Sequence, residues 1–267
     1  MKGRVLIVAG SDSGGGAGIQ ADIKAVTALG GYAMTALTAL TAQNTEGVFA
    51  IHDVPPDFVA RQMRVVLDDL GADCIKIGML HRPEIIEAVC RVLETEAAGI
   101  PVVVDPVMMA KGGHPLLTPE SMTALRTRLV PMARVLTPNL PEAEALAEID
   151  GQDPLALAEC LLALGPRAVL LKGGHGVGPS LSDLLAEAVH YPETFESPRI
   201  DTPHTHGTGC TLASAIAVGL AQGIGVRDAI VRARAYVLEA IRTAPGYGRG
   251  HGPLNHAHTV VAFPPSA

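Results

Sequence analysis

The chain has 267 residues, of which 48% are hydrophobic and 18% charged. This length and composition suit a globular protein with a sizeable core and exclude a disordered chain. The formal net charge of −7 offers no basic surface for nucleic acid. Only 3% of the residues are aromatic, so the core must be built mainly from aliphatic side chains.

Six short apolar runs predict β-strands. Most are continuously apolar, which is typical of strands covered on both faces of a parallel sheet. The runs are Arg4–Ala9, Met34–Leu40, Cys74–Ile77, Val102–Val104, Val135–Leu136 and Ala168–Leu171.

Eight longer segments predict helices, each beginning at or just after a proline or glycine. They are Gly18–Leu29, Pro56–Leu70, Pro83–Ala97, Pro119–Leu129, Pro141–Ala147, Pro154–Leu164, Cys210–Gln222 and Val226–Ala244. The alternation of strands and helices predicts one α/β domain over residues 1–267, a three-layer α/β/α sandwich with a mostly parallel central sheet. Ligands bind such sheets beyond the carboxyl ends of the strands.

No segment suits a targeting signal or a membrane span. The run Val5–Gly10 is too short for a signal peptide, and Ala33–Ala42 is too short to cross a bilayer. The cysteines show no close pairing pattern, and three of the four lie in apolar runs, as expected of buried thiols in a reducing compartment. We therefore expect a cytoplasmic protein. The cysteines are Cys74, Cys90, Cys160 and Cys210.

Two of the predicted strands lead into turns whose residues could bind a ligand or take part in catalysis. The glycine-rich segment Gly10–Gly18 follows the first strand; it is neither a Walker loop nor a dinucleotide fingerprint, and a simple tight connection explains it equally well. Asp105 follows the fourth strand, with Lys111-Gly112-Gly113 shortly after. This suits a metal-linked carboxylate beneath a flexible lid, although Asp105 could instead cap a turn.

Two later predicted strands are also followed by polar side chains that could bind a ligand. Asn139 and Glu142 follow the fifth strand, where capping of the next helix is sufficient to explain them alone. Lys172 follows the sixth strand and precedes the flexible Gly173-Gly174-His175 turn. The parallel arrangement brings these groups to one edge of the sheet.

The strongest local signal is Gly207-Thr208-Gly209-Cys210 at the start of a helix. Successive backbone N–H groups there form an anion site, which in phosphoryl transfer would stabilise the γ-phosphate. Cys210 falls in the first turn, where the helix dipole favours a thiolate; it could take a substrate proton or only line the pocket. The alternative is a close-packed helix start. His204 and His206 with Cys210 could imitate a zinc site, but no fourth ligand has suitable spacing.

As a set, these motifs resemble the hydroxymethylpyrimidine/phosphomethylpyrimidine kinases of thiamine biosynthesis, within the ribokinase-like superfamily. The resemblance runs from about Val5 to about His256. Its motifs are Ser11-Asp12 through Gln20-Ala21-Asp22, Ala42-Gln43-Asn44-Thr45, Lys76-Ile77-Gly78-Met79-Leu80, Asp105-Pro106-Val107-Met108, Thr137-Pro138-Asn139-Leu140-Pro141-Glu142-Ala143-Glu144, Lys172-Gly173-Gly174-His175, Thr205-His206-Gly207-Thr208-Gly209-Cys210-Thr211 and Gly252-Pro253-Leu254-Asn255-His256.

The resemblance implies a ribokinase-like homodimer that uses ATP and Mg²⁺ to phosphorylate 4-amino-5-hydroxymethyl-2-methylpyrimidine, first to the monophosphate and then to the diphosphate. It implies a pyrimidine pocket of Gly10, Asp22, Gln43, Met79 and Val107. It assigns ATP phosphates to Asn139, Glu142, Lys172, Thr208 and Gly209, and Mg²⁺ to Asp105 and Glu142, partly through water. It places catalysis on Lys172, Gly207, Gly209 and Cys210.

Three alternatives and two departures accompany this interpretation. Many relatives have Pro-Ser at Ser13-Gly14 and Lys-Ser-Gly at Lys111-Gly112-Gly113. Ribokinase-like sugar kinases usually have Asp at the position of Cys210, which leaves the identity of the proton acceptor open.

The nearest alternative function is that of a pyridoxal or pyridoxine kinase. Gln43 and Met79 favour the pyrimidine substrate over pyridoxal. A non-catalytic sensor of thiamine precursors and a thiol-redox or zinc protein are the others.

Overall fold

The computed structural model describes residues 1–110, 113, 115–151, 153–174 and 178–261. Lys111, Gly112 and His114 of the expected lid, and His175, lie outside this part of the chain. No helix within the described ranges has both the length and the apolar character needed to cross a membrane.

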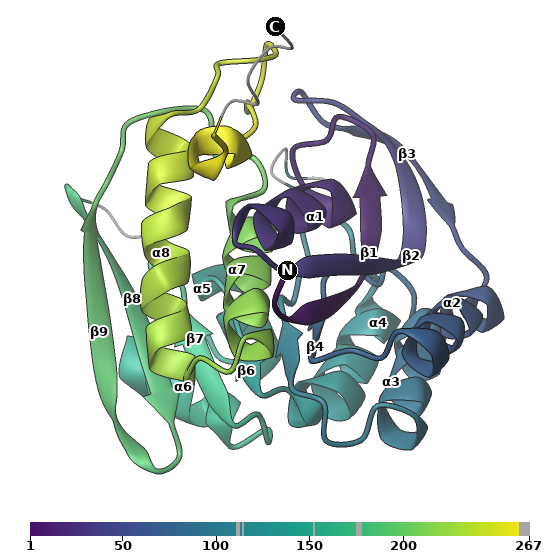
Figure 1. The fold of residues 1–267 in the computed structure, drawn as a ribbon. Coiled ribbons are helices and arrows are strands. Elements are labelled where there is room, and N and C mark those ends of the chain that lie inside the picture. Colours follow the sequence, from purple (N-terminus) through teal and green to yellow (C-terminus); the bar gives the residue numbers. More distant parts are fainter. Residues whose placement is uncertain (111–112, 114, 152, 175–177, 262–267) are drawn as a thin grey trace, which may run out of the picture.

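A nine-stranded sheet forms the centre of the molecule, in the order β3-β2-β1-β4-β5-β6-β7-β8-β9 (Figure 1). The strands from β2 to β7 in that order pair in parallel, and β3, β8 and β9 add antiparallel edges. The mostly parallel sheet is thus confirmed. The strands are β1 (Arg4–Asp12), β2 (Tyr32–Gln43), β3 (Val48–Asp53), β4 (Cys74–Ile77), β5 (Val102–Val104), β6 (Val135–Leu136), β7 (Ala168–Leu171), β8 (Ser180–Glu187) and β9 (His190–Pro198).

All of the predicted helices are present. Seven match their expected bounds to within two residues, and the other ends early because the chain continues from Leu125 to Leu129 as a π-helical turn. The helices are α1 (Gly18–Ala28), α2 (Pro56–Asp69), α3 (Pro83–Thr95), α4 (Pro119–Ala124), α5 (Leu140–Ala147), α6 (Pro154–Leu162), α7 (Thr208–Ala221) and α8 (Val226–Arg242), with short 3₁₀ turns at Val130–Met132 and His256–Thr259.

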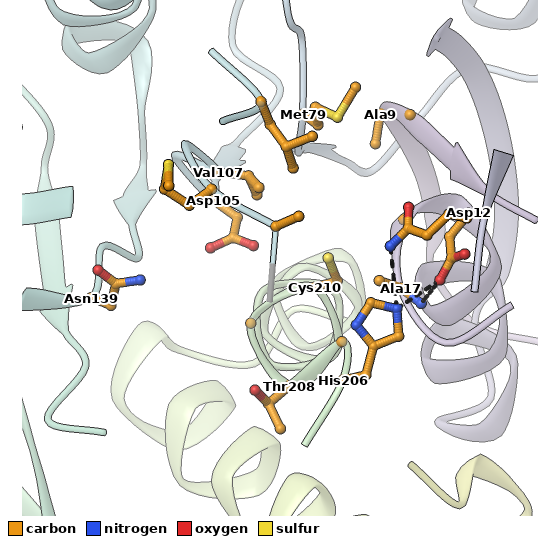
Figure 2. Close-up of a pocket in the computed structure, with 18 of the residues that line it drawn as sticks. Ala9, Asp12, Ala17, Met79, Asp105, Val107, Asn139, His206, Thr208 and Cys210 are labelled. Carbon is orange, nitrogen blue, oxygen red and sulfur yellow. Dashed lines mark hydrogen bonds and ion pairs between the residues drawn. The ribbon is translucent and has the colours of Figure 1, made fainter. Parts of the chain in front are cut away.

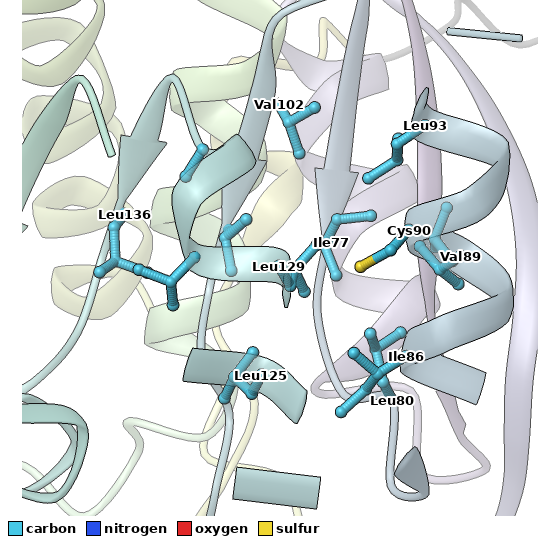
Figure 3. Close-up of a cluster of buried hydrophobic side chains, with 14 of the residues drawn as sticks. Ile77, Leu80, Ile86, Val89, Cys90, Leu93, Val102, Leu125, Leu129 and Leu136 are labelled. Carbon is cyan, nitrogen blue, oxygen red and sulfur yellow. The ribbon is translucent and has the colours of Figure 1, made fainter. Parts of the chain in front are cut away.

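Two hydrophobic clusters cover the two faces of the sheet. One packs α2 to α6 against the sheet and includes Leu6 and Val8 of β1; Figure 3 shows part of it around Ile77. The other packs α1, α7 and α8 against the opposite face and includes Val5 and Ile7. Alternate residues of β1 therefore enter different clusters, which is why the strand is continuously apolar from Val5 to Ala9.

Sequence patterns missed β3, β8 and β9. β3 and β9 are the edge strands of the sheet, and β8 lies between β7 and β9. All three are partly exposed, and β8 mixes Ser, Asp and Glu among its leucines. A strand with one face in water alternates polar and apolar residues and lacks the continuous run that identified the others.

Candidate active site

A cavity of about 540 Å³ opens beyond the carboxyl ends of the parallel strands (Figure 2). The chain turns from β1 to β2 on one side and reaches β4 on the other, so the crevice lies at the point where the strand order reverses. All the sequence-predicted site residues except Asp22 line it. They are Gly10, Gln43, Met79, Asp105, Val107, Asn139, Glu142, Lys172, Gly207, Thr208, Gly209 and Cys210.

The turn that precedes α7 forms the floor of this cavity. Gly207 is the N-cap residue and has a φ of 82°, a left-handed conformation that suits glycine. A Cβ atom on Gly207 would also overlap the carbonyl oxygen of Gly16, and one on Gly209 would lie 3.3 Å from Lys172 Nζ. Both glycines therefore let the turn approach its neighbours closely. Thr208 N donates to the carbonyl oxygen of Thr205 at 3.5 Å, and the N–H groups that follow it lie at the helix start, where an anion can bind.

Lys172 joins two carboxylates beside this turn. Its Nζ atom lies 3.0 Å from Asp105 Oδ1 and 3.9 Å from Glu142 Oε2. Burial alone would lower the pKa of Lys172, but the two carboxylates outweigh it and the pKa is raised. Burial raises the pKa of Glu142, and Lys172 partly offsets that effect. The lysine is thus held as a cation at the cavity wall.

Asn139 and Glu142 form a reciprocal cap at the start of α5. Asn139 Oδ1 accepts a hydrogen bond from Glu142 N at 2.9 Å, and Glu142 Oε2 accepts one from Asn139 N at 2.8 Å. The capping interpretation of Asn139 is confirmed. The same bonds hold the Glu142 carboxylate in a fixed position on the cavity wall.

Asp22 is the exception among the predicted site residues. Its carboxylate is fully buried, and it accepts hydrogen bonds from Lys76 Nζ at 2.9 Å and from Ser214 Oγ at 2.7 Å. It does not line the cavity, and its direct contact with the pyrimidine stays a prediction. Lys76 itself lines the cavity, a role that its position inside an apolar strand concealed.

Asp12, Thr41 and His206 also line the cavity and were not predicted as site residues. Asp12 Oδ2 lies 2.8 Å from His206 Nε2, and Asp12 accepts bonds from the backbone of Gly14, Gly16 and Ala17. Asp12 therefore connects the first glycine loop to the segment that precedes Gly207. Only its place in the quoted motif could have pointed to it.

Comparison with known proteins bears on these features. Residues 12–255 match the family model described as phosphomethylpyrimidine kinase. The chain belongs to this family. The chain is 53% identical over 258 residues to the thiamine biosynthesis bifunctional protein ThiED of Geobacter sulfurreducens, covering 96% of this chain and 52% of that protein. It thus spans about half the length of that bifunctional relative.

A second relative matches along its whole length. The hydroxymethylpyrimidine/phosphomethylpyrimidine kinase of Haemophilus influenzae is 45% identical over 262 residues, covering 95% of this chain and 96% of that protein. Among solved structures, the ADP complex of Bacillus subtilis pyridoxal kinase superposes with a TM-score of 0.87 at 35% identity, covering 96% of this chain and 98% of the other. The fold of this kinase is therefore that of the ribokinase-like vitamin kinases.

The Cys210 thiol of this kinase lies at the start of α7, between Asp105 and His206 in the view of Figure 2. The expectation that the helix dipole favours a thiolate is wrong for this environment. Burial raises the pKa of Cys210 to about 12, and the nearby charge of Lys76 opposes this only in part. The thiol is therefore protonated at neutral pH.

Two carboxylates of this kinase, Asp105 and Glu142, face the cavity beside Lys172. No cluster of three or more His, Cys, Asp or Glu suited to a metal occurs within the described ranges. A pair of carboxylates fits Mg²⁺, which keeps several water ligands and takes others from phosphate oxygens.

Proposed function

We propose that this kinase transfers the γ-phosphate of ATP to the hydroxyl group of 4-amino-5-hydroxymethyl-2-methylpyrimidine, and then adds a second phosphate to the monophosphate. The observation that carries the proposal is one cavity that joins a helix-start anion turn and Lys172 to an amide and two apolar side chains, those of Gln43, Met79 and Val107. The names of its full-length relatives describe the same two reactions.

The substrate end of the cavity suits a small aromatic ring. Met79 and Val107 supply apolar contact for its faces, and Met79 packs close to Gly10, which leaves the ring room. The Gln43 amide offers one donor and one acceptor to an aminopyrimidine edge. Asp22 contributes indirectly, by holding Lys76 at the cavity wall.

The phosphate end supplies charge and fixed dipoles. Lys172 and the backbone N–H groups of the turn from Gly207 to Gly209 would hold the transferring phosphate, with Thr208 Oγ1 as a further donor. Asn139 and Glu142 would contact the ATP phosphates. Mg²⁺, held by Asp105 and Glu142 partly through water, would offset phosphate charge.

In the transfer step the substrate hydroxyl oxygen forms a bond to the γ-phosphorus while the bond from that phosphorus to the bridging oxygen breaks, which releases ADP. The hydroxyl proton must go to a base. Cys210 Sγ, at the end of this turn, is our candidate for this base in its thiolate form.

The setting of the enzyme is inferred with its activity. All four cysteines are free thiols, which fits a reducing compartment, and we infer a cytoplasmic enzyme. From the family resemblance we also infer a homodimer in which residues 1–267 act as one catalytic domain.

A product assay tests the proposal. The protein is incubated with ATP, Mg²⁺ and the pyrimidine alcohol, and the monophosphate and diphosphate are resolved by chromatography. We expect both products in sequence, and kcat/KM for the pyrimidine alcohol above that for pyridoxal. A higher kcat/KM for pyridoxal would instead establish the pyridoxal kinase alternative, which the Bacillus subtilis structure makes the natural competitor.

A further inference from the structure

The amide of Gln43 lies between two polar groups of the cavity wall. Thr41 Oγ1 lies 3.0 Å from Gln43 Oε1, and His206 Nε2 lies 3.4 Å from Gln43 Nε2. A half-turn of an amide exchanges its oxygen and nitrogen without moving the rest of the side chain, so the hydrogens of the neighbours decide which atom belongs at which end.

His206 is the neighbour on one side of the Gln43 amide, and Asp12 determines where the hydrogen on His206 Nε2 points. Asp12 accepts three backbone N–H groups as well as His206, and the pKa of this carboxyl is lowered because these bonds outweigh the effect of its burial. An ionised carboxylate only accepts, so His206 Nε2 must carry a hydrogen toward Asp12 Oδ2 at 2.8 Å. That nitrogen therefore cannot accept a bond from Gln43, and an NH₂ group facing it would be repelled.

The neighbour on the other side is Thr41, and Ser11 fixes its hydrogen. Thr41 Oγ1 lies 2.8 Å from the carbonyl oxygen of Ser11, which can only accept. The single hydroxyl hydrogen is therefore donated to Ser11, and Thr41 Oγ1 is left to accept. The end of the Gln43 amide beside Thr41 must then be the NH₂ group.

Both neighbours thus require the Gln43 amide to be rotated by half a turn, so that Oε1 no longer faces Thr41. We propose that Asp12, acting through His206, and Ser11, acting through Thr41, hold the Gln43 amide with its oxygen toward His206 and its NH₂ toward Thr41, so that the cavity accepts a 4-amino ring and rejects the 4-oxo analogue. The inference rests on the proposed function and adds two positioning residues, His206 and Thr41, which act through Gln43.

The chemistry of the ring explains the selectivity. In this orientation the amide presents to the cavity one free acceptor, on Oε1, and one free donor, on Nε2. A 4-aminopyrimidine edge offers the complementary pair, an amino donor beside a ring-nitrogen acceptor. A 4-oxo ring offers an acceptor beside an N–H donor, so both contacts become like against like unless the amide turns. A site built to pair with one pattern leaves its polar groups unpaired against the other, which is costly when they are desolvated.

The same orientation suits the direction of transfer. The amino group would lie on the His206 side, and His206 directly precedes the anion turn that begins at Gly207. The hydroxymethyl group is attached to the ring carbon next to the amino-bearing one. Fixing the amide therefore also favours the ring placement in which the hydroxymethyl group is nearer the turn.

The test compares kcat/KM for the 4-amino substrate and its 4-oxo analogue in the full-length enzyme. In His206→Leu the Nε2 hydrogen is lost, while the three backbone bonds to Asp12 remain. We expect the amino-over-oxo ratio to fall by at least about tenfold, because the amide can now turn to pair with the oxo ring. His206→Gln restores an N–H donor of similar reach, and we expect its ratio to lie within about threefold of the wild type.

A second pair of variants, at Thr41, tests the same inference if the His206 variants do not fold. Thr41→Val removes the acceptor for the Gln43 NH₂ group, whereas Thr41→Ser retains a hydroxyl at the same place. We expect the ratio to fall in the valine variant and to be preserved in the serine variant, with folding followed by circular dichroism. If His206→Leu and Thr41→Val lower kcat/KM for both substrates equally, the residues are merely structural and the inference is wrong.

The outcomes also separate this inference from the proposed function. A wild-type enzyme that fails to phosphorylate the 4-amino alcohol contradicts the proposed function itself. A wild-type enzyme that phosphorylates the 4-amino and 4-oxo compounds equally well retains that function and contradicts only the fixed orientation of Gln43.

Discussion

Lys76 Nζ contacts both carboxylate oxygens of Asp22, at 3.0 and 2.9 Å, and both side chains are completely buried. The carboxylate raises the pKa of Lys76 despite the opposing effect of burial, so the lysine keeps its charge. A cation is thereby fixed at the cavity wall by a partner that lies outside the cavity.

Breaking this pair from one side should destabilise the fold strongly. Lys76→Met leaves the Asp22 carboxylate buried without its cation, and we expect a loss of about 3–5 kcal/mol of unfolding free energy. The double variant Lys76→Met/Asp22→Leu removes both charges and should recover much of that loss. Urea denaturation measures both.

The matched control for this prediction is the exposed pair of Arg4 and Asp73, whose side chains are 47% and 36% exposed. Arg4→Met should cost far less unfolding free energy than Lys76→Met, because water screens the exposed pair. A Lys76→Met variant as stable as Arg4→Met would show that the buried pair does not stabilise the fold.

The pair also shows where sequence analysis reached its limit. The spacing of apolar runs and of Pro- and Gly-started helices predicted the parallel core and every helix, because burial on both faces leaves a continuous apolar signal. Lys76 lies inside such a run, and nothing local shows that its charge meets Asp22, which is 54 positions away.

The cavity was predictable where residues follow strands, as with Asp105 and Lys172, because the carboxyl ends of parallel strands must meet. The contacts between side chains that lie far apart in the sequence were not predictable in this way. His206 meets Asp12 across 194 positions, and the burial that sets the pKa of Cys210 depends on how α7 packs rather than on its first turn.

Glu142 offers a test of the proposed Mg²⁺ contact. Glu142→Gln keeps an oxygen for the capping bond to Asn139 N but removes the negative charge. We expect the Mg²⁺ concentration for half-maximal activity to rise about tenfold, with little change in thermal stability. Glu144→Gln, on the same helix but outside the cavity, should leave that Mg²⁺ dependence unchanged. An unaltered Mg²⁺ dependence in Glu142→Gln would assign Mg²⁺ elsewhere.

His256 should make the fold sensitive to acid. Its ring is buried beside Tyr236, with 3.1 Å between Tyr236 Oη and His256 Nδ1, and burial lowers its pKa from 6.5 to about 4. The unfolded chain therefore takes up a proton on His256 at a higher pH than the folded protein does, and stability falls as pH drops through this window. We expect a contribution of about 2 kcal/mol to the loss of unfolding free energy between pH 7.5 and 5.

Comparison of variants isolates this contribution, since carboxylates titrate in part of the same range. His256→Gln should show a shallower decline of unfolding free energy across pH 7.5 to 5 than the wild type. His190→Gln, which changes an exposed histidine, should decline as the wild type does. Parallel curves for the wild type and both variants would contradict the assignment to His256.

Cys210 makes the last prediction, because its high pKa and its proposed role as base pull in opposite directions. Burial raises the thiol pKa to about 12, so only a small fraction is thiolate at neutral pH. Below this pKa the thiolate fraction grows about tenfold per pH unit. If the thiolate takes the substrate proton, kcat of the wild type should therefore rise from pH 7 to 9 in step with the thiolate fraction.

Cys210→Ala keeps the backbone N–H groups of the turn and removes only the thiol. We expect kcat to fall by about 10²-fold or more and the rise between pH 7 and 9 to disappear, because general-base catalysis is lost while the anion site remains. A variant with near-normal kcat and the same pH profile would remove Cys210 from the base role. The turn would then act through its backbone alone, and the proton would have to pass to another acceptor near the phosphate.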